Sequence, residues 1–145
     1  MPHSTSKTQI TLKDTVDNVD CQAVSAIFTS VEWGTLAPEE LQQAFNRSGN
    51  VRFAYCQEEL IGFGRTIDDG RFYAAIVDLV VKPRYQGQGV GRQILESLSN
   101  ATDSYLFTTL TAAPGKGKFY QKQGWYPLKG GYILPRSDKQ KSHYT

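Results

Sequence analysis

The sequence predicts an α/β fold of the α+β kind, and three observations support this prediction. Apolar runs of strand length recur along the chain, and apolar residues at helical spacing separate some of them. The resulting order of elements is β-α-α-β-β-β-α-β-α-β-β, without an internal repeat. The chain of 145 residues is also long enough to bury a core as one domain.

Composition narrows the class of protein. Hydrophobic residues make up 39% and charged residues 21% of the chain, which is ordinary for a soluble globular domain. A formal net charge of +2 lacks the polybasic signature of a nucleic-acid-binding protein, so no nucleic-acid partner is expected. No apolar run approaches the roughly 18 residues of a membrane-spanning helix. We therefore expect one cytoplasmic domain over residues 1–145, with polar tails at about 1–8 and 137–145.

Cysteine and histidine usage indicates neither a disulfide framework nor a metal site. The two cysteines can form at most one bridge, and we expect both to be reduced. The two histidines lie in polar termini, and no cysteine or histidine shows metal-ligand spacing. No metal is therefore expected.

The elements of the first half follow from alternation, capping residues and helix breakers. Alternating residues at 9–13 predict the first strand. Asp17 or Asn18 can cap a helix that runs to about residue 30. Pro38 suits the first turn of a second helix, and residues 48–50 end it.

The second half contains the remaining strands and two further helices. Two strand patterns joined by a short polar turn predict a hairpin over residues 51–57 and 60–67. Further strands are expected at 71–81, 105–110, 125–128 and 131–134. One helix begins near Gly89, and a shorter one ends at Gly124, in the position of a left-handed C′ glycine.

One stretch of the chain, residues 76–98, joins a buried strand to a helix through a glycine-rich turn. An apolar run interrupted by Asp78 ends at Pro83, which cannot donate to a sheet ladder. Glycines in the turn let an anion approach the first N–H groups of the helix, which have no acceptor within the helix. Arg84 and Arg92 flank the turn and could add charge-assisted contacts. The stretch therefore predicts a phosphate site.

The residues of this turn distinguish between known phosphate-binding motifs. Neither the dinucleotide fingerprint G-x-G-x-x-G nor the Walker A loop fits the chain. Gln86-x-x-Gly89-x-Gly91 resembles the Q/R-x-x-G-x-G/A motif of the GCN5-related N-acetyltransferases, at that family's spacing from the strand end. A second match, residues 118–125, resembles the family's F/L-Y-x-x-x-G-F segment, with Trp125 in place of Phe.

The resemblance covers roughly residues 9–134 and implies both the fold and the cosubstrate. Members of this family have a mixed, mostly antiparallel sheet of about six to seven strands and about four helices, with a splayed fourth strand. They use acetyl-coenzyme A, so the loop would bind its pyrophosphate and the preceding strand its pantetheine arm. A free N–H near Val80 would then contact the thioester oxygen. The residues that the resemblance assigns to the coenzyme are Leu79, Val80, Val81, Gln86, Gly87, Gln88, Gly89, Val90, Gly91 and Arg92.

The resemblance also assigns candidate catalytic residues. Tyr120 matches the tyrosine that protonates the leaving thiolate in many members, although a tyrosine of this kind can also be a core residue. Asp78 is either the base that takes the amine proton or a structural carboxylate bonded to a neighbouring strand or loop. Glu32 is a second candidate base. Ala113 stands where many relatives have an asparagine, so that loop would use backbone groups to contact the coenzyme.

The acceptor is expected to be a small-molecule amine in a pocket with aromatic walls, for which Trp33 and Tyr73 are candidates. Residues 75–78 and 85–89 resemble the plant and cyanobacterial arylalkylamine (serotonin-type) acetyltransferases. A polyamine, an aminoglycoside and a protein lysine stay open as acceptors.

The expected function is that of an acetyl-coenzyme A-dependent N-acetyltransferase, an acyltransferase in which a primary amine attacks the thioester directly. No cysteine is placed for an acyl-enzyme route. The alternative is a non-catalytic module on the same fold that binds or senses acyl-coenzyme A. Exposed final strands often pair two protomers in this family, so a homodimer is an expected assembly.

Overall fold

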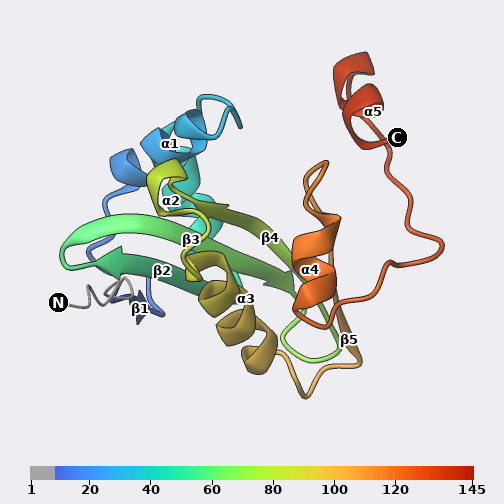
Figure 1. Ribbon diagram of the computed structural model, residues 1–145, viewed down its shortest axis with the longest axis horizontal. Helices are drawn as coiled ribbons and strands as arrows, with labels where there is room; N and C mark the ends of the chain where they lie inside the picture. Colours follow the sequence, from blue (N-terminus) through green and yellow to red (C-terminus); the bar gives the residue numbers. More distant parts are fainter. Residues whose placement is uncertain (1–8) are drawn as a thin grey trace, which may run out of the picture. The chain divides into compact units, whose positions relative to one another are not determined.

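The computed structural model of the protein describes residues 9–145 (Figure 1). The chain forms two compact units, one ending at Leu110 and the other running from Thr111 to Thr145. The prediction of one domain over residues 1–145 therefore stays a prediction. The predicted polar tail at 1–8 lies outside the described residues.

The first unit is built on a mixed sheet of five strands in the order β1-β2-β3-β4-β5. β1 to β4 pair antiparallel with their neighbours, whereas β5 runs parallel to β4. This arrangement confirms the predicted α+β fold with a mostly antiparallel sheet. The strands are β1 (Thr11–Lys13), β2 (Asn50–Cys56), β3 (Glu59–Asp68), β4 (Tyr73–Val81) and β5 (Phe107–Leu110).

Three α-helices cover the two faces of this sheet (Figure 1). α1 (Cys21–Ser30) and α2 (Pro38–Asn46) lie on one face, and α3 (Val90–Ala101) lies on the other. A Cβ added at Gly62 of β3 would lie 3.3 Å from the Ile94 side chain of α3, and one added at Gly64 would lie 2.9 Å from it. The absence of a side chain at these two positions therefore lets α3 approach the sheet closely.

Capping residues explain where the first two helices begin. Asp20 is the N-cap of α1, and its carboxylate accepts from the N–H groups of Gln22 and Ala23. The prediction that Asp17 or Asn18 caps this helix is wrong, because Asn18 has a φ of 62° in the turn before it. α2 begins at Pro38 as predicted, where a missing N–H costs nothing.

Phenylalanine side chains fill the core between the sheet and the first two helices. Phe28 of α1 lies with its ring centroid 5.0 Å from that of Phe63, and Phe45 of α2 packs edge-on against Phe63 at 5.9 Å. Phe53 of β2 completes the group, 5.1 Å from Phe45. All four are at most 2% exposed, so the two helices owe their position mainly to apolar burial.

The second unit contains two short helices, α4 (Gly117–Lys122) and α5 (Asp138–Tyr144). α4 confirms the short helix predicted before Gly124, which has the expected positive φ of 90°. α5 was not predicted, since the polar tail at 137–145 was expected to fray. Ser137 caps it by accepting from the N–H of Gln140.

The two final strands predicted at 125–128 and 131–134 do not form within the described second unit. A strand needs a ladder partner, and no segment of this unit pairs with these residues. Pro127 lacks an N–H, and Gly130 has a φ of 77°, so local geometry also interrupts the pattern. The five strands observed in residues 9–145 are accordingly fewer than the six to seven expected.

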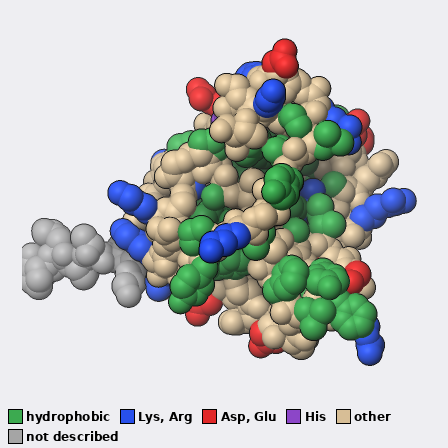
Figure 2. All heavy atoms as spheres, turned by 90° about the vertical axis from the view of Figure 1, so that its right-hand side faces the viewer, with side chains coloured by type: hydrophobic (Ala, Val, Ile, Leu, Met, Phe, Trp, Pro, Cys, Tyr) green, Lys and Arg blue, Asp and Glu red, His purple; other side chains and the backbone are tan. Residues whose placement is uncertain are grey.

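Exposed hydrophobic side chains occur in both units, and Figure 2 shows some of them among scattered charged residues. In the first unit they are Trp33, Ile67, Phe72, Tyr73, Leu106 and Phe107, and in the second they are Tyr126, Leu128, Tyr132, Ile133 and Leu134.

We expect Phe63→Ala to lower the free energy of unfolding by about 3–5 kcal/mol, because it removes a ring buried between α1, α2 and β2. Denaturant unfolding followed by circular dichroism measures the change. Phe72→Ala is the matched control, since this ring is 46% exposed and should cost about 1 kcal/mol or less. Equal losses in the two variants would contradict the assignment of the core.

Candidate functional site

The fourth strand is paired on both edges for only part of its length. β5 pairs with β4 from Tyr73 to Ile76, whereas β3 pairs with β4 as far as Val81. The stretch from residue 77 to 81 therefore has one edge without a strand partner in the described part of the first unit. This splayed end of β4 was predicted from the family resemblance.

Backbone groups of β4 point toward this open edge. The N–H of Lys82 donates to the carbonyl of Ile61 in β3 at 2.7 Å. Because N–H groups alternate between the two edges of a strand, that of Val80 faces β3 and those of Leu79 and Val81 face away from it. The open edge thus presents backbone donors on either side of Val80.

A bulge at Asp78 lies at the start of the open stretch. Val77 pairs with Arg65 and Val80 with Phe63, so two residues of β4 oppose Gly64 alone. Asp78 has a φ of 54°, a left-handed conformation that aspartate tolerates better than most residues. The extra residue breaks the alternation and turns the Asp78 side chain to the same face as Val77.

The Asp78 carboxylate forms a largely buried ion pair with Arg65 of β3. Arg65 Nε lies 2.8 Å from Asp78 Oδ2, and the two side chains are 15% and 17% exposed. The guanidinium also donates to Ser48 Oγ at 3.2 Å and lies 5.5 Å from the centroid of the Phe45 ring. These contacts support a structural role for Asp78, and a role as base would have to use Oδ1.

The loop after β4 leaves the N-terminus of α3 uncapped. Gly87 and Gly89 have φ values of 78° and 87°, and Gly89 is the N-cap of the helix. No side chain caps α3, so the N–H groups of its first turn, from Val90 to Arg92, have no acceptor within the helix. The positive end of the helix dipole lies at the same place. This end of α3 therefore has backbone geometry that suits an anion, and the binding of one there stays a prediction.

The glutamine of the motif connects the loop to the open end of β4. Gln86 Nε2 donates to the carbonyl of Val81 at 3.0 Å, and Gln88 Nε2 donates to the carbonyl of Arg84 at 3.0 Å. Both amides therefore tie the loop to backbone carbonyls before it. The guanidinium of Arg92 lies within 3.7 Å of where a Cβ of Gly89 would stand, so a cation borders the helix N-terminus.

Tyr120, the candidate acid, belongs to α4 of the second unit. Its ring centroid lies 5.0 Å from that of Phe119 and 6.4 Å from that of Trp125. Burial raises the pKa of the Tyr120 phenol above its ordinary value, which keeps the hydroxyl protonated at neutral pH. Asp78 and the loop belong to the first unit.

The two candidate acceptor residues lie at opposite ends of β4. Trp33 follows α1, and its ring centroid lies 6.4 Å from that of Phe28. Phe28 packs against Phe63 of β3, and Phe63 is paired with Val80 near the end of β4. Tyr73 lies at the start of β4 against Phe107. Seven residue steps separate Tyr73 from Val80, or about 23 Å along the strand. The structure does not bring Trp33 and Tyr73 together.

Glu59 is a residue near the site that the sequence did not single out. It begins β3 and contacts the segment that leads into the loop, through Lys82 and Tyr85. Sequence reasoning assigned Glu59 to a polar hairpin turn. Only the pairing of β3 with the end of β4 places it beside the loop.

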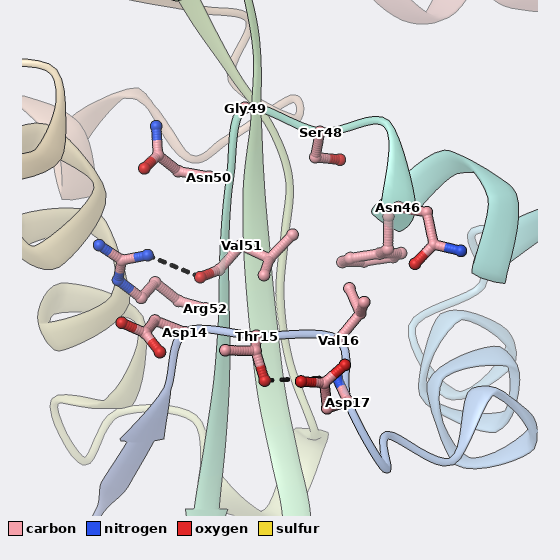
Figure 3. Close-up of a pocket in the computed structure, with 11 residues that line it drawn as sticks. Asp14, Thr15, Val16, Asp17, Asn46, Ser48, Gly49, Asn50, Val51 and Arg52 are labelled. Carbon is pink, nitrogen blue, oxygen red and sulfur yellow. Dashed lines mark hydrogen bonds between the residues drawn. The ribbon is translucent and has the colours of Figure 1, made fainter.

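A pocket of about 350 Å³ lies elsewhere in the first unit (Figure 3). It is lined by residues between β1 and α1, by the last two residues of α2 and by residues around the start of β2, and none of them belongs to the loop after β4. In it, the N–H of Asp17 donates to Thr15 Oγ1, and Arg52 donates to the carbonyl of Val51. No predicted site residue lines this pocket.

Within residues 9–145, no helix is long and apolar enough to cross a lipid bilayer. The same residues contain no group of three or more His, Cys, Asp or Glu side chains arranged to hold a metal ion.

Comparison with known proteins identifies the family. Residues 20–131 match the model of the acetyltransferase (GNAT) domain, which is more than half of the chain. The chain therefore belongs to the GNAT acetyltransferase family, as the sequence motifs predicted. It is a GNAT-family N-acetyltransferase, and membership implies an acyl-coenzyme A cosubstrate.

Named relatives agree with this assignment. An uncharacterized N-acetyltransferase, ycf52, of Pyropia yezoensis is 28% identical over 131 residues, covering 82% of this chain and 74% of that protein. Serotonin N-acetyltransferase 2 of rice (Oryza sativa), a chloroplastic protein, is 32% identical over 84 residues, or 55% of this chain and 42% of that protein. The local resemblance to serotonin-type enzymes is thus confirmed as a partial match.

Solved structures show the same fold. A GNAT-family acetyltransferase from Streptococcus pneumoniae superposes with a TM-score of 0.73 at 23% identity. The match covers 89% of this chain and 100% of that one. A protein of unknown function from Staphylococcus aureus superposes with a TM-score of 0.75 at 26% identity, covering 88% of this chain and 100% of that one.

Asp78→Asn should lower the free energy of unfolding by about 1–3 kcal/mol, because it leaves the Arg65 guanidinium without its charge partner in a largely buried place. Asparagine also tolerates the left-handed backbone, so the change tests the side chain alone. Thermal and denaturant unfolding measure it. The exposed Asp103→Asn is the control, and a loss no larger than that of the control would refute the structural role.

Proposed function

We propose that the protein transfers an acetyl group from acetyl-coenzyme A to a primary amine by direct attack of the amine. The observation that carries this proposal is the uncapped N-terminus of α3, which follows directly on the open end of β4. The helix N-terminus suits a pyrophosphate, and the open strand edge just before it in the chain suits an extended arm with amide groups. A ligand in which these two parts are joined fits both features.

The loop fits a pyrophosphate on three grounds. The N–H groups of residues 90–92 have no acceptor within the helix, and the helix dipole adds positive potential. Arg92 supplies a cation at the same end. A Cβ at Gly87 would have no atom within 4 Å, so the space over the loop is open.

The open edge of β4 fits an extended arm with amide groups. Leu79 and Val81 direct their backbone N–H groups away from β3, and the arm can pair with these donors as an added strand does. The Val81 carbonyl already accepts from Gln86. We assign the thioester oxygen to a free N–H of this edge, next to Val80, where it would stabilise negative charge in the transition state.

Proton transfers complete the proposed reaction. The amine nitrogen forms a bond to the thioester carbonyl carbon, the C–S bond breaks, and the thiolate takes a proton from the Tyr120 hydroxyl. The raised pKa of that phenol favours the protonated form which this role requires. The proton lost by the amine goes to a base, for which Asp78 Oδ1 and the exposed Glu32 are the candidates.

For the acceptor we propose an arylalkylamine. The partial match to the rice serotonin N-acetyltransferase supports this class. Trp33 is 47% exposed beside the carboxylate-bearing Glu32, so an aromatic face and an acid are available to a cationic aromatic amine at the end of α1. Tyr73 stays a weaker candidate because it lies at the other end of β4.

Isothermal titration of acetyl-coenzyme A into the wild type and Gly89→Glu tests the loop. The variant should lose binding, because a carboxylate would stand at the helix N-terminus in place of the pyrophosphate. Gly89→Gln is the matched control, since it adds the same bulk and backbone strain without the charge and should lose less affinity. No binding by the wild type would refute the proposed function.

Tyr120→Phe should lower kcat about 100-fold and leave the affinity for acetyl-coenzyme A unchanged, because it removes only the proton donor. Because the pKa of Tyr120 is raised, the phenol should lose its proton only above its ordinary pKa of about 10. The wild-type kcat should therefore decline above that pH, and this decline should be absent in Tyr120→Phe. Stopped-time assays of thiol release measure both effects. Wild-type turnover in Tyr120→Phe would exclude this tyrosine as the acid.

A further inference from the structure

One carboxylate of the β2–β3 hairpin contacts three residues of the segment before the loop. Glu59 Oε2 lies 2.8 Å from Lys82 Nζ, and Glu59 Oε1 accepts from the Tyr85 hydroxyl at 2.9 Å. The Arg84 guanidinium lies 3.8 Å from the same Oε1 and donates to the Tyr85 hydroxyl at 3.0 Å. The two carboxylate oxygens of Glu59 thus bind the first and the last residue of the turn at 82–85.

This turn is held by its own backbone as well. Pro83–Tyr85 forms a single 3-10 turn, in which the N–H of Tyr85 donates to the carbonyl of Lys82 at 2.9 Å. The Arg84 side chain lies over the Tyr85 ring, 4.9 Å from its centroid. Lys82 and Tyr85 hold the pKa of the Glu59 carboxyl below its ordinary value, so the carboxylate is charged at neutral pH.

The anchored turn leads without interruption into the anion-binding loop. Gln88 Nε2 donates to the carbonyl of Arg84, so the middle of the loop is tied to the turn. Gly87 and Gly89 follow with positive φ, and glycines have the largest conformational freedom to lose when a ligand orders them. An anchor at 82–85 reduces that freedom before the ligand arrives.

We propose that Glu59 is a positioning residue of the acyltransferase, which preorganises the loop for the coenzyme by holding Lys82, Arg84 and Tyr85. The inference rests on the proposed binding of the coenzyme pyrophosphate at the N-terminus of α3. Glu59 acts through these three residues and touches neither the coenzyme nor the reacting atoms.

If Glu59 instead competes with the coenzyme for Lys82 and Arg84, the expected change in affinity is the opposite one. Lys82 and Arg84 could themselves bind the 3′-phosphate of the coenzyme, and Glu59 would then compete with that phosphate for them. Removal of the Glu59 charge would strengthen coenzyme A binding in that case and would leave 3′-dephospho-coenzyme A, which has the pyrophosphate alone, unaffected. The two roles therefore differ in sign.

The test compares Glu59→Gln with Glu58→Gln, which removes the same charge from an exposed neighbour that forms no ion pair with any described residue. Calorimetric titration of both proteins with acetyl-coenzyme A and with 3′-dephospho-coenzyme A measures the dissociation constants. We expect Glu59→Gln to weaken both ligands about fivefold and Glu58→Gln to weaken neither. Kinetically, KM for acetyl-coenzyme A should rise while kcat and KM for the amine stay unchanged.

Tyr85→Phe gives a second, milder variant in case Glu59→Gln does not fold. It removes only the hydroxyl bonded to Glu59 Oε1 and should raise the same two dissociation constants by a smaller factor. Wild-type affinities in both variants would overturn the inference and leave the proposed function intact. Tighter binding of acetyl-coenzyme A alone would also overturn it, in favour of competition. A wild type that binds neither ligand would overturn the proposed function and the inference together.

Discussion

The interruption of pairing along β4 is the constraint on which the rest of the site depends. β5 accompanies β4 only as far as Ile76, and the bulge at Asp78 follows two residues later. Beyond that point the backbone groups on one edge have no strand partner among residues 9–110 of the first unit. The ion pair between Asp78 and Arg65 stabilises the bulge from the side of α2, so the distortion is supported by a buried electrostatic contact. The open edge thus begins where β5 ends and the bulge follows, and the uncapped N-terminus of α3 comes after it in the chain.

Local signals made much of the fold and the loop predictable from the sequence. Pro38 and Gly124 occupy the helix ends where proline and glycine are expected, and the β2–β3 hairpin follows its alternation. The loop between β4 and α3 was also predictable. A proline ends a strand and glycines allow the positive φ of a turn, so the residues of the loop themselves indicate its structure. The strands expected at 125–128 and 131–134 were not, since alternation indicates a strand but does not provide the partner that a strand requires.

Residues that act across the sheet could not be found in this way. Arg65 and Asp78 are separated by 13 positions, and Glu59 and Tyr85 by 26, so only the register of β3 and β4 brings each pair together. Trp33 and Tyr73 show the converse, because the same reasoning from aromatic character selected both although they lie at opposite ends of β4. Residue type indicates what a side chain can bind, whereas position in the fold decides whether two side chains can bind it jointly.

The bond from Gln86 to Val81 has a consequence for solubility. An unpaired sheet edge is a template onto which a strand of another molecule can add, and such edges promote aggregation. Gln86 Nε2 occupies the Val81 carbonyl, which is one of the acceptors that an incoming strand would need. The amide therefore protects the open end of β4 from indiscriminate strand addition while the adjacent donors stay available. A neighbouring strand would also occupy this carbonyl, but it would cover the N–H donors of the same edge as well.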